Sequence, residues 1–112
     1  MANEEQVEML KRSVEEWNRW RTNNPSIIIN LIRSDLNDVN LQGANLSNAY
    51  LCGATLRQAN LRGANLSRSD LTSVDLSNVR LDEAHLEGAI MTLVNLSGSC
   101  LVSANLRGSM LC

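Results

Sequence analysis

A leucine returns at every fifth residue from Leu31 onward, and this spacing constrains the fold more than any other feature of the sequence. It defines seventeen positions up to Leu111, of which sixteen are leucine and one is Met91. Of the eighteen leucines in the chain, only Leu10 and Leu93 lie elsewhere. A high leucine content alone therefore cannot explain the pattern. We call these seventeen positions the leucine lattice.

A period of five fits neither of the regular secondary structures. On a helix, which turns about 100° per residue, steps of five would scatter the leucines around the axis. In a strand, an odd step would place successive leucines on opposite faces. All lattice residues can point inward only if the backbone changes direction about once every five residues. The spacing therefore predicts a coiled solenoid with short extended sides.

The residues around each lattice position agree with this geometry. Two residues earlier the chain carries Ala eight times, Ser four times, Val four times and Ile once, all small or aliphatic side chains that suit a narrow interior. All six glycines fall two residues after a lattice position, where a turn would use their freedom at positive φ. The single proline, Pro25, lies before the lattice. Proline would interrupt backbone hydrogen bonds between stacked coils.

Segments such as Ala44–Asn45–Leu46–Ser47–Asn48 resemble the A(N/D)LXX unit of the pentapeptide-repeat family, and so does the segment from Ala64 to Arg68. The resemblance extends over residues 29–112. It implies an all-β solenoid, a right-handed, four-sided parallel β-helix with twenty residues per coil; the periodicity alone does not fix four sides. Residues 29–108 would form four coils, and one side of the core would be the stack of Leu31, Leu51, Leu71, Met91 and Leu111.

Residues 1–28 are predicted to form an N-terminal capping helix and a linker. The helix is expected over residues 3–22, with Asn3 as N-cap and Gln6 completing a capping box. Its apolar residues follow helical spacing and form one stripe that must be buried. The open end of the first coil is the nearest surface that could bury it. The stripe consists of Val7, Leu10, Val14 and Trp17.

Several apolar residues are expected to point outward on the side built on Leu31 and Leu51. Those near the end of the chain are a candidate contact patch for a protein partner, or else ordinary apolar surface. This candidate patch consists of Ile90, Leu93, Met110 and Cys112. Those near the start of the solenoid are expected to pack beneath the N-terminal segment instead. They are Ile32, Tyr50 and Cys52.

The last repeat in the sequence has no capping segment after it. An exposed ring of strand edges and leucines invites pairing. The alternatives are a homodimer through the C-terminal end, a further segment of the same chain, or a separate partner chain. Dimerisation through this end occurs in some members of the resembled family, and we expect a homodimer.

The charged and polar columns test the twenty-residue register. If coils contain twenty residues, Arg62 lies beside Asp82 and Glu87 lies beside Arg107. The asparagines at 40 and 60, and those at 45 and 65, should likewise stack as short ladders. Such exposed ion pairs contribute only about 0.2–1 kcal/mol each, so they report geometry more than stability.

We identify no catalytic, cofactor-binding or metal-binding residues. His85 is the only histidine, and a convex face offers it no oriented partners. The three cysteines should all be free thiols. Cys52 and Cys112 would share a side but lie about 14 Å apart, beyond disulfide reach, and Cys100 would lie on the opposite side.

The overall composition excludes several classes of function. The net charge of -2 singles out neither nucleic acid nor an anionic membrane as partner, and no secretory signal or membrane span is evident. The sequence therefore predicts a soluble, cytoplasmic, non-enzymatic structural or protein-interaction module with an unknown protein partner. The alternative implied by the resemblance is a DNA mimic that binds topoisomerases. Those members are long, acidic rods, whereas this repeat region holds seven acids against six arginines.

Overall fold

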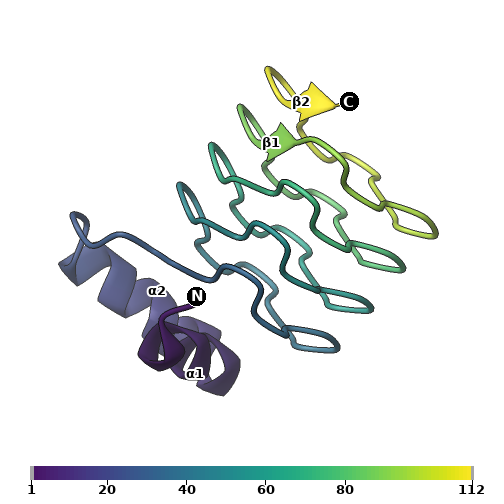
Figure 1. Cartoon of the computed structure of the whole chain (residues 1–112). Coiled ribbons are helices and arrows are strands. Elements are labelled where there is room, and N and C mark those ends of the chain that lie inside the picture. The colour runs from purple at the N-terminus through teal and green to yellow at the C-terminus, as the bar shows by residue number, and fades with distance from the viewer. Residues whose placement is uncertain (1, 112) are drawn as a thin grey trace.

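The computed structural model describes residues 2–111, and it places two short helices at one end of a stack of coils (Figure 1). Helix α1 spans Glu4–Arg12 and helix α2 spans Val14–Asn23. Strand β1, Ile90–Met91, and strand β2, Met110–Leu111, lie at the opposite end. The molecule measures 31 × 23 × 21 Å along its principal axes.

The coils are held together by parallel backbone pairing between residues twenty positions apart. Tyr50 pairs with Asn30 on one side and with Asp70 on the other, and the same register continues through Ile90 to Met110. Such pairs recur at every fifth residue, so that each coil has four sides of five residues. The twenty-residue register implied by the resemblance is thus the register of the structure.

Each side ends in a tight turn. At Leu41, for example, the carbonyl oxygen accepts a 3.0 Å hydrogen bond from the amide of Ala44, and Gly43 between them has φ +71°. A positive φ at the third turn residue alone is typical of a type II turn. All six glycines occupy this turn position, as predicted, and ten other residues share it. Leu93, with φ 59°, is the least suited of these to a left-handed conformation.

The interior is dry and aliphatic. Leu31, Leu51 and Leu71 are fully buried and Met91 is 1% exposed, as expected for the core stack, while the side chain of Leu111 lies outside the described part of the structure. Small residues fill the positions two before the lattice. Where that residue is a serine, its hydroxyl donates to the carbonyl oxygen three residues earlier, as between Ser69 and Leu66 at 2.6 Å. This bond lets a buried hydroxyl occupy an apolar core.

The N-terminal segment forms two helices and not the single helix predicted for residues 3–22. The helix breaks at Ser13, which has extended backbone angles, φ -162° and ψ 121°. The Ser13 side chain accepts a 3.1 Å hydrogen bond from the amide of Glu16, so it acts as the N-cap of α2. Serine readily takes this role because its oxygen competes with helical hydrogen bonds.

The two predicted roles at the start of α1 have different outcomes. Asn3 is the N-cap, as predicted, and its Oδ1 accepts from the amide of Gln6 at 3.2 Å. Gln6, however, does not complete a capping box. Its Nε2 donates to the carbonyl oxygen of Ile28 at 2.9 Å, and its Oε1 accepts from the amide of Asn30 at 2.8 Å. The side chain pairs with the backbone leading into the first coil as a neighbouring strand would.

The predicted apolar stripe lies against the first coil. Val7, Leu10 and Trp17 are buried and Val14 is partly buried in the same apolar cluster as the lattice leucines. The helix pair therefore extends the core at this end of the stack and does not present its apolar face to solvent.

The predicted asparagine columns exist, but their side chains bond differently from a ladder. Asn45 and Asn65 pair through their backbones. The Oδ1 atom of Asn45 accepts from the amide and the hydroxyl of Ser47, two residues later in its own repeat, and Asn65 does the same with Ser67. Each asparagine thus stabilises its own turn, which explains why Asn, Asp and Ser recur at these positions.

Candidate interaction surfaces

The predicted apolar patch is exposed near the last coil. Ile90 in β1 and Met110 in β2 are paired residues on adjacent coils, with 37% and 55% of their surface exposed. Leu93 lies at the following turn and is 75% exposed. The structure thus brings three of the four predicted residues to one end of one side. Cys112 lies outside the described residues.

The other predicted apolar group on this side does not form one covered cluster. Ile32 is partly buried beside α1, with Val7, as expected. Tyr50 is 47% exposed, so the prediction that it packs beneath the N-terminal segment is wrong. The helices cover the end of the stack and not its side, where Tyr50 lies. Cys52 is partly buried, and burial together with a hydrogen bond to Asp70 raises the pKa of its thiol.

Three further exposed aliphatic residues were not predicted. Val102 is 66% exposed on the side opposite Ile90, and Ile27 and Ile28 are 49% and 70% exposed in the linker. Val102 immediately follows the lattice residue Leu101, and its outward position could have been read from the five-residue pattern. An isolated exposed aliphatic residue is common on protein surfaces and needs no partner.

The charged columns hold one of the two predicted ion pairs. Arg62 Nε lies 4.0 Å from Asp82 Oδ2, one coil apart as expected, and Arg80 Nη2 lies closer, at 3.2 Å. The hydrogen bond from Arg80 is the main cause that lowers the pKa of Asp82, and a hydrogen bond from the Cys100 thiol is the next largest. Within residues 2–111 there is no ion pair between Glu87 and Arg107. The Oε1 atom of Glu87 lies 3.3 Å from Nδ1 of His85 instead.

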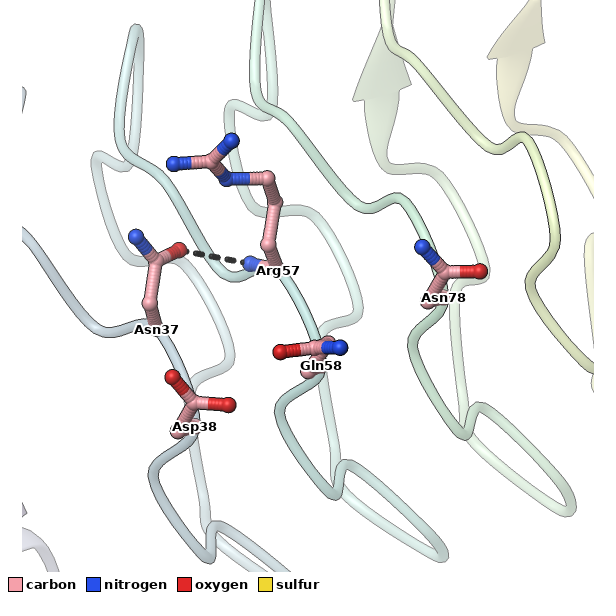
Figure 2. A pocket seen from close by; sticks show the side chains of 5 residues that line it. All are labelled: Asn37, Asp38, Arg57, Gln58 and Asn78. Atoms are coloured by element: carbon pink, nitrogen blue, oxygen red, sulfur yellow. Dashed lines mark hydrogen bonds between the residues drawn. The ribbon is translucent and has the colours of Figure 1, made fainter.

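The side built on Leu36 and Leu56 carries a shallow polar hollow of about 250 Å³ (Figure 2). Figure 2 shows Asp38, Gln58 and Asn78 in a row on successive coils, each at a turn. Asn37 Oδ1 accepts a 2.7 Å hydrogen bond from the amide of Arg57 across this hollow. The hollow is lined by amides, one carboxylate and one guanidinium, and it holds no nucleophile paired with a base.

The residues that could carry chemistry are dispersed. His85 is exposed on an outer face beside Glu87. Among residues 2–111 there is no group of three or more His, Cys, Asp or Glu side chains that could hold a metal ion. Cys52 and Cys100 are free thiols, as predicted, while Cys112 is not described.

Neither described helix is long and apolar enough to cross a membrane.

Part of the N-terminal edge of the first coil is bonded to side chains of α2. Trp17 Nε1 and Arg21 Nη1 both donate to the carbonyl oxygen of Asn45, at 2.8 and 3.0 Å. Asn18 forms two bonds: its Nδ2 donates to Gly43 O at 3.0 Å and its Oδ1 accepts from Asn45 N at 2.8 Å. At Asn45 these side chains supply the donors and the acceptor that a preceding coil would supply, as the first coil does for Asn65.

The last coil is more open. Leu96, Leu101 and Leu106 are only partly buried, whereas the lattice leucines of the earlier coils are fully buried. The amides of these three residues have no hydrogen-bond partner among the described residues. This surface therefore combines apolar side chains with unpaired donors, as strand edges do.

Comparison with known proteins agrees with this architecture. The family profile described as pentapeptide repeats, with eight copies, matches residues 29–68 and 69–108. No curated protein matches the sequence. Pentapeptide-repeat proteins fold as right-handed β-helices, and the solved structures similar to this chain are of that kind.

Two solved structures match over most of the repeat region. A pentapeptide repeat protein from the Arabidopsis thaliana thylakoid lumen is 34% identical, with a TM-score of 0.69; the match covers 70% of this chain and 55% of that protein. A pentapeptide repeat protein from Nostoc PCC 7120 is also 34% identical, with a TM-score of 0.66, and the match covers 72% and 83% of the two chains. This chain thus spans about half of the Arabidopsis protein. It belongs to the pentapeptide-repeat family.

Proposed function

We propose that this protein is a non-enzymatic interaction module that binds a protein partner through the patch formed by Ile90, Leu93 and Met110. The observation that carries the proposal is the position of these side chains. Ile90 and Met110 are adjacent in register, and Leu93 is the most exposed large aliphatic residue of the described chain at 75%. A cluster of exposed apolar side chains is a common feature of a protein contact surface.

The position of Leu93 adds to the support. Leucine is disfavoured at φ 59°, where glycine, asparagine and serine occupy most of the equivalent turns. An exposed leucine there contributes neither to the core nor to the turn. Contact with a partner would bury this side chain, which the fold itself leaves exposed.

The charge of the repeat region favours a protein partner over the mimicry of DNA. Its seven acids and six arginines give a balance of -1. Within the described residues, two of these acids are paired with arginines, Asp75 with Arg57 at 3.6 Å and Asp82 with Arg80 at 3.2 Å. A surface that imitates a nucleic-acid backbone needs a dense, unpaired row of negative charge.

A pull-down from the source organism tests the patch. The wild type is compared with an Ile90→Asp/Met110→Asp variant, and Val102→Asp serves as the matched control because Val102 is similarly exposed but on the opposite side. We expect the double variant to lose specific proteins that the wild type and the control both retain. Recovery of the same proteins by all three would exclude the patch.

A second proposal is a homodimer through the last coil. It is supported by the partial exposure of Leu96, Leu101 and Leu106 and by their unpaired amides. Light scattering across a range of concentrations should show a mass of twice 12.3 kDa. A strict monomer at high concentration would exclude the dimer.

We also propose a cytoplasmic location for the protein. The free thiols Cys52 and Cys100 fit a reducing compartment, and cell fractionation tests the location.

A further inference from the structure

The helix pair covers only part of the N-terminal edge of the first coil. Its hydrogen bonds reach Asn30 on one side and residues Gly43 to Ser47 on another. Between these two points, from Ser34 to Gln42, no residue of α1 or α2 forms a hydrogen bond with the coil. We call residues 34–42 the open edge. Its lattice residues, Leu36 and Leu41, are nevertheless fully buried. The open edge therefore exposes backbone groups but no leucine side chain of the core.

The open edge presents a defined set of unpaired backbone groups. The amide and carbonyl of Asp35, the carbonyl of Asn37, and the amide and carbonyl of Asn40 have no partner among the described residues. One coil further on, the equivalent groups are all bonded. The amide of Thr55 donates to Ser34 O at 3.0 Å, for example.

The arrangement of these groups specifies the backbone that would satisfy them. Inside the solenoid, Leu36 N donates to Thr55 O at 2.8 Å and Asp38 N donates to Arg57 O at 2.9 Å. With the bond from Thr55 N, each extended side thus makes three bonds to the preceding coil. Asp35 and Asn37 occupy the positions of Thr55 and Arg57 in the first coil. An extended segment running parallel to residues 34–38 would therefore make the same three bonds.

The charge on the open edge selects among such segments. Asp35 and Asp38 are its only charged residues. Both are exposed, and neither forms an ion pair with a described residue. An exposed carboxylate at a strand edge disfavours pairing with an acidic or neutral segment and favours one with lysine or arginine.

A hollow lies beside the open edge, where the earlier residues of such a parallel segment would be. Between α1 and the first coil lies a space of about 360 Å³ with apolar side chains from Val7 and Ile32. Its lining also includes two cations, Lys11 and Arg33, and two acids, Glu4 and Asp35, so the lining has no net charge. In a parallel arrangement, the earlier residues of the ligand lie at this hollow and the later residues lie beside Asp38.

We propose that the open edge binds an extended segment of a partner protein by parallel strand addition, with an apolar residue in the hollow followed by lysine or arginine beside Asp38. Strand addition takes its affinity from backbone bonds and its specificity from the side chains at the edge. This inference deepens the proposed role in protein binding, but it concerns a different surface from Ile90 and Met110. A failed test here leaves the apolar patch unaffected, and the reverse is also true.

The test uses the full chain and an acetylated, amidated six-residue peptide of two threonine–valine pairs followed by two lysines. Hydrogen exchange measured by NMR reports the site directly. We expect the peptide to slow exchange of the Asp35 amide, and to leave unchanged the amides of Asn30 and Asn45, which are bonded already. The same peptide with alternate backbone nitrogens methylated should not protect Asp35, because it cannot donate the required bonds.

A matched pair of variants separates the edge from diffuse charge attraction. Asp38 and Glu83 occupy equivalent turn positions, with φ 63° and 61°, and both are exposed. Asp38→Asn should weaken peptide binding by about 1.4- to 5-fold, the range for one exposed ion pair, whereas Glu83→Gln should not. Equal weakening by both variants, protection by the methylated peptide, or unchanged exchange at Asp35 would each overturn the proposal.

Discussion

The indole Nε1 of Trp17 donates a 2.8 Å hydrogen bond to the carbonyl oxygen of Asn45, and this bond links α2 to the first coil. Together with Arg21 Nη1, the indole satisfies a carbonyl at the end of the stack, where the equivalent groups of later coils are bonded to a neighbouring coil. The rest of the Trp17 side chain is fully buried in the apolar cluster. A single residue thus supplies both apolar contact and a backbone partner at the end of the solenoid.

Trp17→Ala should lower the free energy of unfolding by about 3–5 kcal/mol, the usual range for loss of a large buried aromatic side chain. Trp17→Phe should cost less, because Arg21 still donates to the carbonyl of Asn45. Urea denaturation measures both. Trp20→Phe is the control, since Trp20 is only partly buried and its indole makes no hydrogen bond among the described residues. An equal effect of the two Trp→Phe changes would contradict the role of the Trp17 donor.

Gln6→Glu should destabilise the protein at neutral pH, because an ionised carboxylate cannot donate to the carbonyl of Ile28. A protonated carboxyl could still donate there and accept from Asn30. Folding therefore raises the pKa of the introduced carboxyl. The variant should be closest to the wild type below the unfolded-state pKa of about 4.3, and it should lose stability as pH rises through the higher folded-state pKa.

Thermal unfolding of this variant between pH 3 and pH 7 measures the effect relative to the wild type. The control is Glu5→Gln, which changes an exposed carboxyl in the same turn of α1. A pH-independent difference between Gln6→Glu and the wild type would show that the paired amide geometry is not what stabilises this position.

Gly98→Ala should cost more stability than Gly63→Ala. Both glycines have positive φ, 73° and 64°, so each substitution carries a backbone cost of about 1–2 kcal/mol. A Cβ at Gly98 would in addition collide with the side-chain oxygen of Asn78, whereas at Gly63 nothing lies within 4 Å. Chemical denaturation of both variants, and of Gly98→Ala combined with Asn78→Gly, separates the cost of the backbone conformation from the cost of the collision. If the combined variant shows no relief, the collision does not contribute.

Leu93→Asn should raise the free energy of unfolding by up to about 1 kcal/mol, because asparagine tolerates the left-handed conformation that leucine disfavours. Ser103→Asn, at a similar exposed turn with φ 60°, is the control and should change stability less. If the patch binds a partner, Leu93→Asn should also weaken that binding. A destabilised Leu93→Asn would mean that the leucine packs more favourably than its 75% exposure indicates.

Ser77→Ala should reduce the stability gained between acid and neutral pH. The Ser77 hydroxyl donates to Asp75 Oδ1 at 2.7 Å, and this bond is the main cause that lowers the pKa of Asp75. A lowered folded-state pKa stabilises the protein above the unfolded-state pKa of about 3.9, and this stabilisation is lost as pH falls through the folded-state value.

The matched control for this prediction is Ser67→Ala, in which the same bond is made to an asparagine. Ser67 donates to Asn65 Oδ1 at 2.6 Å, and an amide does not titrate. The free energy of unfolding, measured by urea denaturation between pH 2 and pH 7, should therefore differ from that of the wild type by a pH-dependent amount for Ser77→Ala and by a constant amount for Ser67→Ala. Identical pH dependence in the two variants would exclude Asp75 as the titrating group.

The lattice could be predicted because a five-residue period leaves the backbone few ways to bury every leucine. Leu31, Leu51 and Leu71 share one interior for that reason, and the six glycines mark turns because positive φ suits glycine. The family resemblance added the four-sided coil, which periodicity alone leaves open. The exposure of Ile90 and Met110 followed from their place in the register.

Other features depended on contacts between distant parts of the chain, which no local pattern encodes. The pairing of Gln6 with Ile28 and Asn30 arises because α1 lies against the backbone that leads into the first coil. The break at Ser13 is different, because the bond that caps α2 there is local. The Glu87 carboxylate lies 3.3 Å from the His85 ring and forms no ion pair with Arg107 among the described residues, so the twenty-residue register alone does not decide which side chains pair.

The sequence by itself determined the coiled core, because burial of an apolar residue at every fifth position is a property of spacing alone. Only the tertiary structure decided which backbone groups at the ends of the stack find partners. Those bonds depend on where the helix pair comes to lie. It covers the groups at Asn45 and leaves those at Asp35 open, and that difference arises from packing.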